Sequence, residues 1–381
     1  MSNKDLQPDG VPNERRIRRM LDAAARVAMR AAGDVEPNPL VGCVIARGDT
    51  IIGIGHHRRF GGPHAEREAL ADCRRRGHDP RGATLYCTLE PCRHHGKQPP
   101  CTDAVIGAGI ARVIYARRDP GPESGGGDRV LCDAGIASLC VPDASDLAVR
   151  LSDPFVHRVR TGRPWVIAKW AQTLDGRIAT RTGESQWITG PAMRRRVHRL
   201  RSCVDAVLVG VGTVLADDPM LTPRDVRRVR RDPSRVVLDT HGRTPRDAAL
   251  IRSASEHRTV IVTADPAAEF PSPVRVLRVP GGGAGVDPRA AIEAIGQQLG
   301  AASILVEAGP RVLGSLLEAD LVDEAFVHIA PIVLADQGAM AVASGRDAPR
   351  LADARRLTVL RSRSIGGDVE IWCRRTDAMQ P

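Results

Sequence analysis

Aromatic residues are scarce in this chain: only 3% of its 381 residues are aromatic, as four Trp, two Tyr and four Phe. The hydrophobic cores must therefore be built mainly from Val, Ile, Leu and Ala, and few rings are available to stack nucleic-acid bases. No apolar run approaches the roughly 20 residues of a membrane-spanning helix. No stretch resembles a signal peptide, and the polar residues 1–13 are expected to form a loose tail.

The nine cysteines show no regular spacing, so they do not indicate a disulfide framework. A reducing cytoplasm is the expected compartment. The hydrophobic content of 42% and the charged content of 26% are those of an ordinary globular protein. A chain of this length can form two domains, each with its own core. The net charge of +10 comes mostly from Arg, which suits nucleic acid or a phosphorylated small molecule, or reflects a compositional bias.

Helices and strands are expected to alternate over the first 160 residues, which predicts an α/β layer fold. Apolar residues recur at helical spacing from residue 14, and Gly33 ends that segment. Two apolar runs flank Arg47–Asp49, as in a β-hairpin. The remaining predictions are a helix from Pro63 to Gly77, a strand at 83–89, a helix at 101–109, a strand at 111–116 and a loop at 119–127.

The pattern breaks at 153–164, just before a new strand at 165–171, so we expect a domain boundary near residue 160. The second half alternates in the same way. Strands are predicted at 205–211, 234–240, 258–264, 274–279, 303–309 and 324–333, and helices at 191–202, 288–299 and 310–318. The segment 356–373 predicts a terminal hairpin that turns at Gly366-Gly367.

Four residues of the first half suggest a metal centre. His64 and Glu66 lie two residues apart behind Pro63, while Cys92 and Cys101 are separated by eight residues. A catalytic zinc ion takes three protein ligands and keeps one position open, and His64, Cys92 and Cys101 supply that number. Because residues i and i+2 diverge on a helix, we expect His64 at the start of the helix and Glu66 in its first turn.

The chemistry of such a site would be hydrolytic. Cys101 is expected to begin a helix, where unpaired N–H groups favour a thiolate. Zinc activates water near neutral pH, and Glu66 would then move protons as ammonia leaves an amino-bearing ring carbon. Two alternatives stay open: no metal at all, or a closed structural site completed by His94 or His95. The other seven cysteines are expected to be core or incidental thiols.

The first half resembles the zinc-dependent cytidine deaminase superfamily. The eight-residue gap between Cys92 and Cys101 is longer than in most nucleoside deaminases and points to one family within it. The chain is similar to the bifunctional riboflavin-biosynthesis deaminase/reductase family. In the first half this rests on "NPLVGCVI" (38–45), "GGPHAE" (61–66), "TLEPCRHHGKQPPC" (88–101) and "RDPGPESGGG" (118–127). In the second half it rests on the segments 163–179, 183–190, 198–224 and 306–324, which resemble the family's reductase domain, similar in fold to dihydrofolate reductase.

The resemblance implies a zinc-dependent deaminase domain at 1–160 and an NADPH-dependent reductase domain at 161–381. The first would deaminate 2,5-diamino-6-(5-phosphoribosylamino)pyrimidin-4(3H)-one, and the second would reduce the ribosyl group of the product to ribityl. It implies one zinc ion on His64, Cys92 and Cys101, and Glu66 as proton carrier. Lys169 and Asp217 are the implied catalytic residues of the reductase.

The resemblance also implies binding residues. For substrate they are Asn38 in the deaminase, and Ser185, Arg201, Leu221, Arg224 and Glu307 in the reductase. For NADPH they are Ala171, Trp187, Thr213, Asp217, Thr240, Gly309, Pro310, Arg311, Val312, Leu313, Gly314 and Ser315. Physical chemistry supports part of this. Arg201 and Arg224 offer planar forks for a phosphate, and residues 306–315 run from a strand into a helix start.

The chain departs from the family pattern at Gln98, at His56 and Phe60, at Thr173 and at Ala335. These changes affect expected substrate contacts and remove no catalytic group. The expected partner is the small phosphoribosyl pyrimidine, with no nucleic acid and no membrane, in a homodimer formed through the reductase domain. Two rival hypotheses are a nucleic-acid deaminase of the tRNA type, and a protein in which one half is only an assembly module.

Overall fold

The computed structural model describes residues 12–282, 285–345 and 349–375. Most of the tail expected at 1–13 therefore lies outside the described residues. Asn13 belongs to them, and its side chain accepts a hydrogen bond from the backbone N–H of Arg16 (2.9 Å), which caps the first helix. The chain divides into two compact units between Thr161 and Gly162. Within the described residues, no helix is both long enough and apolar enough to cross a bilayer.

The first unit has a five-stranded mixed sheet in the order β2-β1-β3-β4-β5. The β1–β2 and β1–β3 pairs are antiparallel, whereas β3–β4 and β4–β5 are parallel. The strands are β1 (Gly42–Arg47), β2 (Thr50–His56), β3 (Thr84–Cys87), β4 (Arg112–Tyr115) and β5 (Ala137–Cys140). The helices are α1 (Glu14–Ala28), α2 (Ala65–Arg75), α3 (Cys101–Gly107), α4 (Gly127–Asp133), α5 (Asp146–Arg150) and α6 (Asp153–Thr161).

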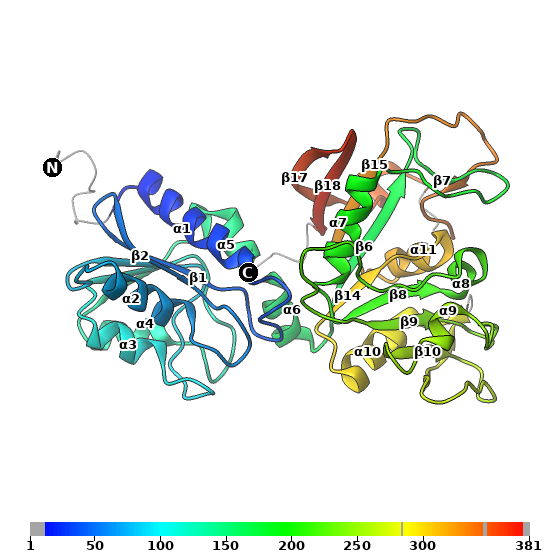
Figure 1. Ribbon diagram of the computed structural model, residues 1–381. Helices are drawn as coiled ribbons and strands as arrows, with labels where there is room; N and C mark the ends of the chain where they lie inside the picture. The colour runs from blue at the N-terminus through cyan, green and yellow to red at the C-terminus, as the bar shows by residue number, and fades with distance from the viewer. Residues whose placement is uncertain (1–11, 283–284, 346–348, 376–381) are drawn as a thin grey trace. The chain divides into compact units, whose positions relative to one another are not determined.

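Helices cover both faces of this sheet, as the predicted α/β layering requires (Figure 1). Apolar residues of α1 and α5 pack on one face, and those of α2, α3 and α4 pack on the other. The hairpin around Arg47 and the strands β3 and β4 lie where the sequence predicts them. The α-helix α1 ends at Ala28, and a 3₁₀ turn follows it from Met29 to Ala31. Helix α6 forms at 153–161, where the sequence pattern breaks and predicted no helix.

The second unit has a nine-stranded sheet in the order β11-β10-β9-β8-β14-β6-β15-β18-β17. The strands from β11 to β15 are parallel, and the terminal hairpin β17–β18 adds two antiparallel strands. They are β6 (Trp165–Gln172), β8 (Ala206–Gly210), β9 (Ser234–Leu238), β10 (Thr259–Thr263), β11 (Arg275–Arg278), β14 (Ser303–Val306), β15 (Glu324–Ile329), β17 (Leu357–Ile365) and β18 (Asp368–Arg375).

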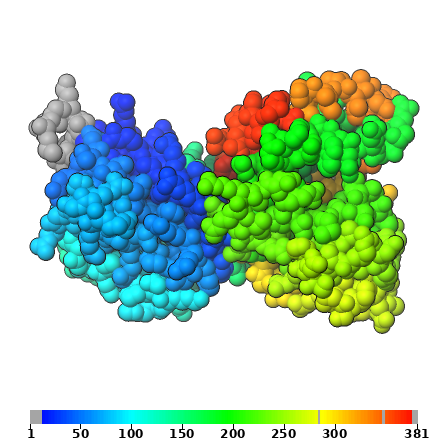
Figure 2. All heavy atoms as spheres, viewed as in Figure 1, coloured from blue at the N-terminus to red at the C-terminus, as the bar shows by residue number. Residues whose placement is uncertain are grey.

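Helices also cover both faces of this second sheet. Residues of α10 and α11 pack on one face, and residues of α7, α8 and α9 on the other. The helices are α7 (Pro191–Arg201), α8 (Val211–Asp217), α9 (Ala249–Arg252), α10 (Pro288–Leu299) and α11 (Pro310–Glu318). The short strands are β7 (Arg177–Ala179), β12 (Gly281–Gly282), β13 (Gly285–Val286) and β16 (Met340–Ala341). Figure 2 shows the orange segment with β16 against the green segment with β7, and the two strands pair.

Candidate active sites

The structure brings His64, Cys92 and Cys101 together from three separate elements. His64 precedes the first residue of α2, Cys92 lies in the loop after β3, and Cys101 is the first residue of α3. The Nδ1 atom of His64 lies 3.5 Å from the Sγ of Cys92 and 3.3 Å from the Sγ of Cys101. All three ligand atoms lie within 4.8 Å of one another.

This arrangement fits a zinc ion. Tetrahedral coordination with Zn–S near 2.3 Å and Zn–N near 2.0 Å sets the N···S distances at about 3.5 Å, close to those found. The pKa of Cys92 is lowered by the hydrogen bond from the Cys101 thiol and by His64, which favours its thiolate. The pKa of Cys101 is instead raised, by its bond to Cys92 and by burial.

A closed structural site would need a fourth protein ligand. Within the described part of the chain, the group able to share one ion has three members, and neither His94 nor His95 belongs to it. His95 is exposed, whereas His94 lines the adjacent pocket. The three-ligand arrangement leaves a coordination position for a water molecule, which is typical of catalytic zinc.

Glu66 lies in the first turn of α2 and is only 3% exposed. Burial raises the pKa of Glu66 to about 6, and the negative charge of Cys92 contributes in the same direction. A carboxyl group with this pKa can accept and return a proton near neutral pH. Glu66 is not a member of the three-ligand group, so its carboxylate is available for proton transfer.

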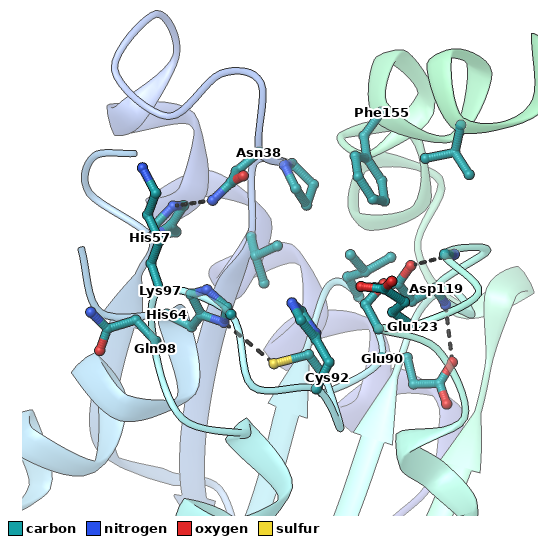
Figure 3. Close-up of a pocket in the computed structure, with 18 of the residues that line it drawn as sticks. Asn38, His57, His64, Glu90, Cys92, Lys97, Gln98, Asp119, Glu123 and Phe155 are labelled. Atoms are coloured by element: carbon teal, nitrogen blue, oxygen red, sulfur yellow. Dashed lines mark hydrogen bonds between the residues drawn. The ribbon is translucent and has the colours of Figure 1, made fainter. Parts of the chain in front are cut away.

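A cavity of about 410 Å³ opens over these residues. Figure 3 shows Asn38 and His57 on one side of it, Asp119 and Glu123 on the other, and His64 and Cys92 at its base. Two departures from the family pattern lie at the cavity wall. The ammonium of Lys97 sits 3.9 Å from the centre of the Phe60 ring, and the Gln98 amide donates to the carbonyl of Gly61 (3.1 Å). Both departures therefore shape the cavity surface.

His57 lines the site, although the sequence analysis did not predict a role for it. Its Nδ1 lies 3.0 Å from the carbonyl oxygen of Pro63, so Nδ1 carries the proton and donates. Its Nε2, 3.2 Å from Nδ2 of Asn38, then accepts from that amide. Burial lowers the pKa of His57, which keeps the ring neutral. The amide oxygen of Asn38 is thereby left to accept a hydrogen bond from a ligand.

The sequence analysis gave Gly127 no role beyond its place in the segment 118–127, yet it supports a proposed metal ligand. A Cβ atom at this position would lie 1.8 Å from the carbonyl oxygen of Pro91, the residue before Cys92. The loop that carries Cys92 therefore packs directly on the first residue of α4. The run of three glycines at 125–127 offered a sequence signal, but the loop it would contact is about 35 residues away.

We expect Gly127→Ala to displace the Pro91-Cys92 turn and to lower zinc content and deaminase activity together, each by at least about tenfold. The measurements are metal analysis of the purified protein and ammonia release. Gly107→Ala is the matched control, because a Cβ on Gly107, in α3, meets nothing within 4 Å. A Gly127→Ala protein with normal zinc content would contradict this role of Gly127.

In the second unit, the implied substrate residues Arg201 and Glu307 form a largely buried ion pair, with 12% and 11% of their side chains exposed. Arg201 ends α7, Glu307 follows β14, and two hydrogen bonds of 2.6 and 3.0 Å join their side chains. Arg201 also donates to the carbonyl of Thr222, next to the buried Leu221. The planar fork of Arg201 is thus engaged by Glu307, whereas Arg224 is exposed and can meet a phosphate.

Lys169 lies on β6 near this pair. Burial lowers the pKa of Lys169, and Arg201 adds to that effect while Glu307 opposes it. His198 faces the same group: burial and then Arg201 and Arg224 lower its pKa to about 4, so it stays neutral. The structure therefore gathers Lys169, Arg201 and Glu307 into one cluster that alternates positive and negative charge.

The implied cofactor residues lie on several elements of the second unit. Ala171 is on β6, Thr213 and Asp217 are on α8, and Asp217 accepts a hydrogen bond from Gln186 (3.0 Å). Trp187 is 63% exposed, and the neighbouring Ser185 is half-buried. The hydroxyl of Thr240 accepts a hydrogen bond from the backbone of Val286 (3.1 Å).

Residues 309–315 form the start of α11, where Gly309 is the N-cap and contributes no side-chain cap. The first-turn N–H groups are thus free of a capping side chain, which fits a cofactor phosphate. Leu313 belongs to the core, and a Cβ on Gly314 would lie 1.8 Å from the carbonyl oxygen of Ser344. The Leu313 side chain and the Gly314 backbone therefore pack against protein, and Arg311 is the exposed member of the turn.

The other departures from the family pattern keep their local hydrogen bonds. Thr173 donates from its hydroxyl to Asp175 (2.6 Å), and the same carboxylate accepts from the backbone N–H of Ala335 (2.9 Å). Ala335 has a φ of 52°, a left-handed conformation that favours glycine. This explains why glycine is usual there, and the Asp175 contact holds Ala335 in place.

Comparison with known proteins matches both units. The family model for the cytidine and deoxycytidylate deaminase zinc-binding region matches residues 14–117, and that for the RibD C-terminal domain matches residues 164–371. Riboflavin biosynthesis protein RibD of Escherichia coli K12 is 40% identical over 362 residues, which are 91% of this chain and 96% of that protein. The chain belongs to the RibD family.

Other relatives agree with this family. The Actinobacillus pleuropneumoniae RibD is 38% identical over 91% of this chain and 92% of its own length. The crystal structure of the Thermotoga maritima diaminohydroxyphosphoribosylaminopyrimidine deaminase/5-amino-6-(5-phosphoribosylamino)uracil reductase superposes with a TM-score of 0.81 at 34% identity, covering 95% of this chain and 99% of that one. Acinetobacter baumannii RibD, form 1, gives 0.78 at 32% identity, covering 96% and 100%.

Family membership confirms the predicted fold class and function. This RibD family chain is a bifunctional enzyme of riboflavin biosynthesis with a zinc-binding deaminase region, a reductase region that uses NADPH, and a small-molecule substrate. The deaminase-like first unit and the reductase second unit are both present in the predicted order.

Proposed function

We propose that residues 1–161 deaminate 2,5-diamino-6-(5-phosphoribosylamino)pyrimidin-4(3H)-one and that residues 162–381 reduce the ribosyl group of the product with NADPH. The observation that carries the proposal is the three-ligand group of His64, Cys92 and Cys101 at the base of a cavity, with the buried Glu66 beside it. The name of the Thermotoga maritima relative gives a diaminohydroxyphosphoribosylaminopyrimidine deaminase and a 5-amino-6-(5-phosphoribosylamino)uracil reductase, which supports the proposal.

In the deaminase site, His64, Cys92 and Cys101 would hold the zinc ion. Zinc bound there activates a water molecule near neutral pH. Glu66 takes up a proton as the attack on the ring carbon begins, and it returns that proton to the departing amine, which leaves as ammonia. The amide oxygen of Asn38, oriented by His57, accepts a hydrogen bond from the pyrimidine.

In the reductase site, the helix start at 309–315 with Thr213, Thr240 and Trp187 would hold NADPH, which supplies a hydride. Lys169 and Asp217 are the proposed catalytic residues, and a lysine of lowered pKa can give a proton to the ribosyl oxygen as it is reduced. The exposed Arg224 would pair with the 5-phosphate. Glu307 holds Arg201 in place and, together with Ser185 and Leu221, forms the substrate side of the site.

A two-step assay with and without a zinc chelator tests this function. We expect the native enzyme to release ammonia from the phosphoribosyl pyrimidine and to oxidise NADPH when given the deaminated compound. Removal of zinc should lower ammonia release at least 100-fold, because water activation is lost. Reduction of the deaminated compound should stay unchanged, and added zinc should restore the first step.

Two results would contradict the assignment. Deamination of a stem-loop RNA in preference to the pyrimidine would favour the nucleic-acid deaminase. Failure to oxidise NADPH with the deaminated compound would favour a second unit that serves only for assembly.

We also propose that the protein works in the cytoplasm as a homodimer paired through residues 162–381. The nine cysteines lie within the described residues and none is paired in a disulfide there, which suits a reducing compartment. Strand β17 ends the order of the nine-stranded sheet, so its outer edge can pair with a second copy, and its Val359 is 59% exposed. Light scattering coupled to gel filtration measures the mass, and 40.9 kDa in solution would contradict the dimer.

A further inference from the structure

Helix α6 contributes the one aromatic ring of the deaminase cavity that lies between the two family-model matches. Phe155 and Val159 both line the cavity and are four residues apart, so they lie on the same face of the helix. The deaminase match ends at residue 117 and the reductase match begins at 164. This wall of the cavity is therefore not part of the general deaminase core.

The position of α6 is fixed at its first turn. Asp153 and Val156 are each 3% exposed, and the carboxylate of Asp153 pairs with the guanidinium of Arg117. Arg117 follows β4 and lies two residues before Asp119, which lines the same cavity. Because the helix start is anchored beside the site, the Phe155 ring is held over the cavity. Figure 3 shows Phe155 pointing from α6 into that space.

The rest of the cavity divides its chemistry between polar and apolar surfaces. The polar groups of the cavity, which are the metal ligands, Glu66 and Asn38, would face the edge of a bound ring, where its amino and carbonyl groups lie. The faces of a pyrimidine are apolar and polarisable, and they bind best against another flat ring or an aliphatic surface. Phe155 and Val159 supply such a surface opposite the metal ligands, and Leu89 adds to the apolar lining.

We propose that Phe155 is a substrate-binding residue of the deaminase, and that its ring packs on the pyrimidine of the phosphoribosyl substrate while Val159 extends the contact. The inference rests on the proposed deaminase function. It makes the helix that leads into residue 162 part of the first active site. Selectivity for a pyrimidine with a large substituent would then depend on a segment that simpler deaminases of the matched region need not share.

The test is Phe155→Ala in the full-length zinc-loaded enzyme. We expect KM for ammonia release from the phosphoribosyl pyrimidine to rise about tenfold or more, in line with the loss of one base–aromatic contact. Zinc content and NADPH-dependent reduction of the deaminated compound should be unchanged. Phe155→Tyr keeps the ring and should restore KM to within about threefold. Arg160→Ala, an exposed position on the same helix, is the matched control and should leave all three measurements as they are.

Each outcome decides the proposal. If the wild-type enzyme releases no ammonia from this substrate, the proposed function itself is wrong. If the wild type is active and Phe155→Ala keeps its KM, the helix does not bind substrate and the inference is overturned. If Phe155→Ala loses zinc or fails to fold, Phe155→Leu replaces it; leucine keeps the apolar packing of the helix but not the flat ring, so KM should still rise about threefold or more. A Phe155→Leu enzyme with full zinc and a wild-type KM would likewise overturn the inference.

Discussion

Glu66→Gln should abolish ammonia release while leaving zinc content at the wild-type level. The glutamine amide has nearly the shape of the carboxyl group but cannot carry the proton between water and the departing amine. General acid–base catalysis is worth roughly 10²- to 10⁴-fold, so we expect the rate to fall by about 10³-fold or more. Metal analysis and an ammonia assay on the same sample measure both effects.

The second unit provides the internal control for this variant. Reduction of supplied deaminated compound with NADPH should proceed at the wild-type rate, because Glu66 and the reductase residues lie in different compact units. A variant that has lost its zinc would mean that Glu66 ligates the metal, and the three-ligand assignment would be wrong. Equal loss of both activities would point to misfolding of the whole chain.

Arg201→Met should abolish the reductase and destabilise the second unit. The change leaves the Glu307 carboxylate, 11% exposed, without the two hydrogen bonds and the charge that hold it. Removing one partner of a buried ion pair costs about 3–5 kcal/mol. We expect a loss of this size in the free energy of unfolding of the second unit, measured by urea denaturation. Arg199→Met, an exposed position on the same helix, is the matched control and should cost less than about 0.5 kcal/mol.

The same pair predicts how the stability of this unit depends on pH. Burial opposes the ionised form of Glu307, but the charge and hydrogen bonds of Arg201 outweigh it and lower the pKa of Glu307 from 4.5 to about 2. A carboxyl group whose pKa is lower in the folded than in the unfolded state stabilises the fold fully at pH values above its unfolded-state pKa. This stabilisation is lost as the pH falls towards the folded-state pKa. The contribution, roughly 3 kcal/mol, should therefore vanish between about pH 4.5 and pH 2.

Urea denaturation curves recorded between about pH 4.5 and pH 2 test whether the contribution of Glu307 to stability is lost on acidification. The wild type should lose more stability on acidification than Arg201→Met, in which the pair is already broken. Parallel loss in the two proteins would mean that Glu307 titrates at its ordinary pKa and that the pair contributes nothing. Ammonia release at neutral pH should be the same in both proteins.

The regular elements of the second unit were accessible from the sequence. The predicted helices at 288–299 and 310–318 have those bounds in the structure, and the terminal hairpin turns at Gly366-Gly367 as expected. Such elements are long and strongly periodic, so their pattern is a local property of the chain. The nine-residue helix α6 was missed, because Pro154 near its start and few apolar positions leave no clear period.

The order of the strands was not accessible in the same way. Strand β14 lies between β8 and β6, although about 90 residues separate its sequence from β8. Arg201 and Glu307 are 106 positions apart, and no local pattern indicates that the guanidinium proposed for phosphate would be held by that carboxylate. Contacts of this kind depend on how whole sheets and helices pack, which single-sequence periodicity does not record.

The sequence by itself determined the chemical identity of the first site: one imidazole, two thiols and a carboxyl group, each placed by a local turn or helix start. Only the tertiary structure decided the rest. It brought the Sγ atoms of Cys92 and Cys101 to 3.5 and 3.3 Å from one imidazole nitrogen, aligned His57 with Asn38, and placed the Phe155 ring over the cavity. Residue type and local conformation are written along the chain, whereas distances between remote side chains follow from the packing of complete layers.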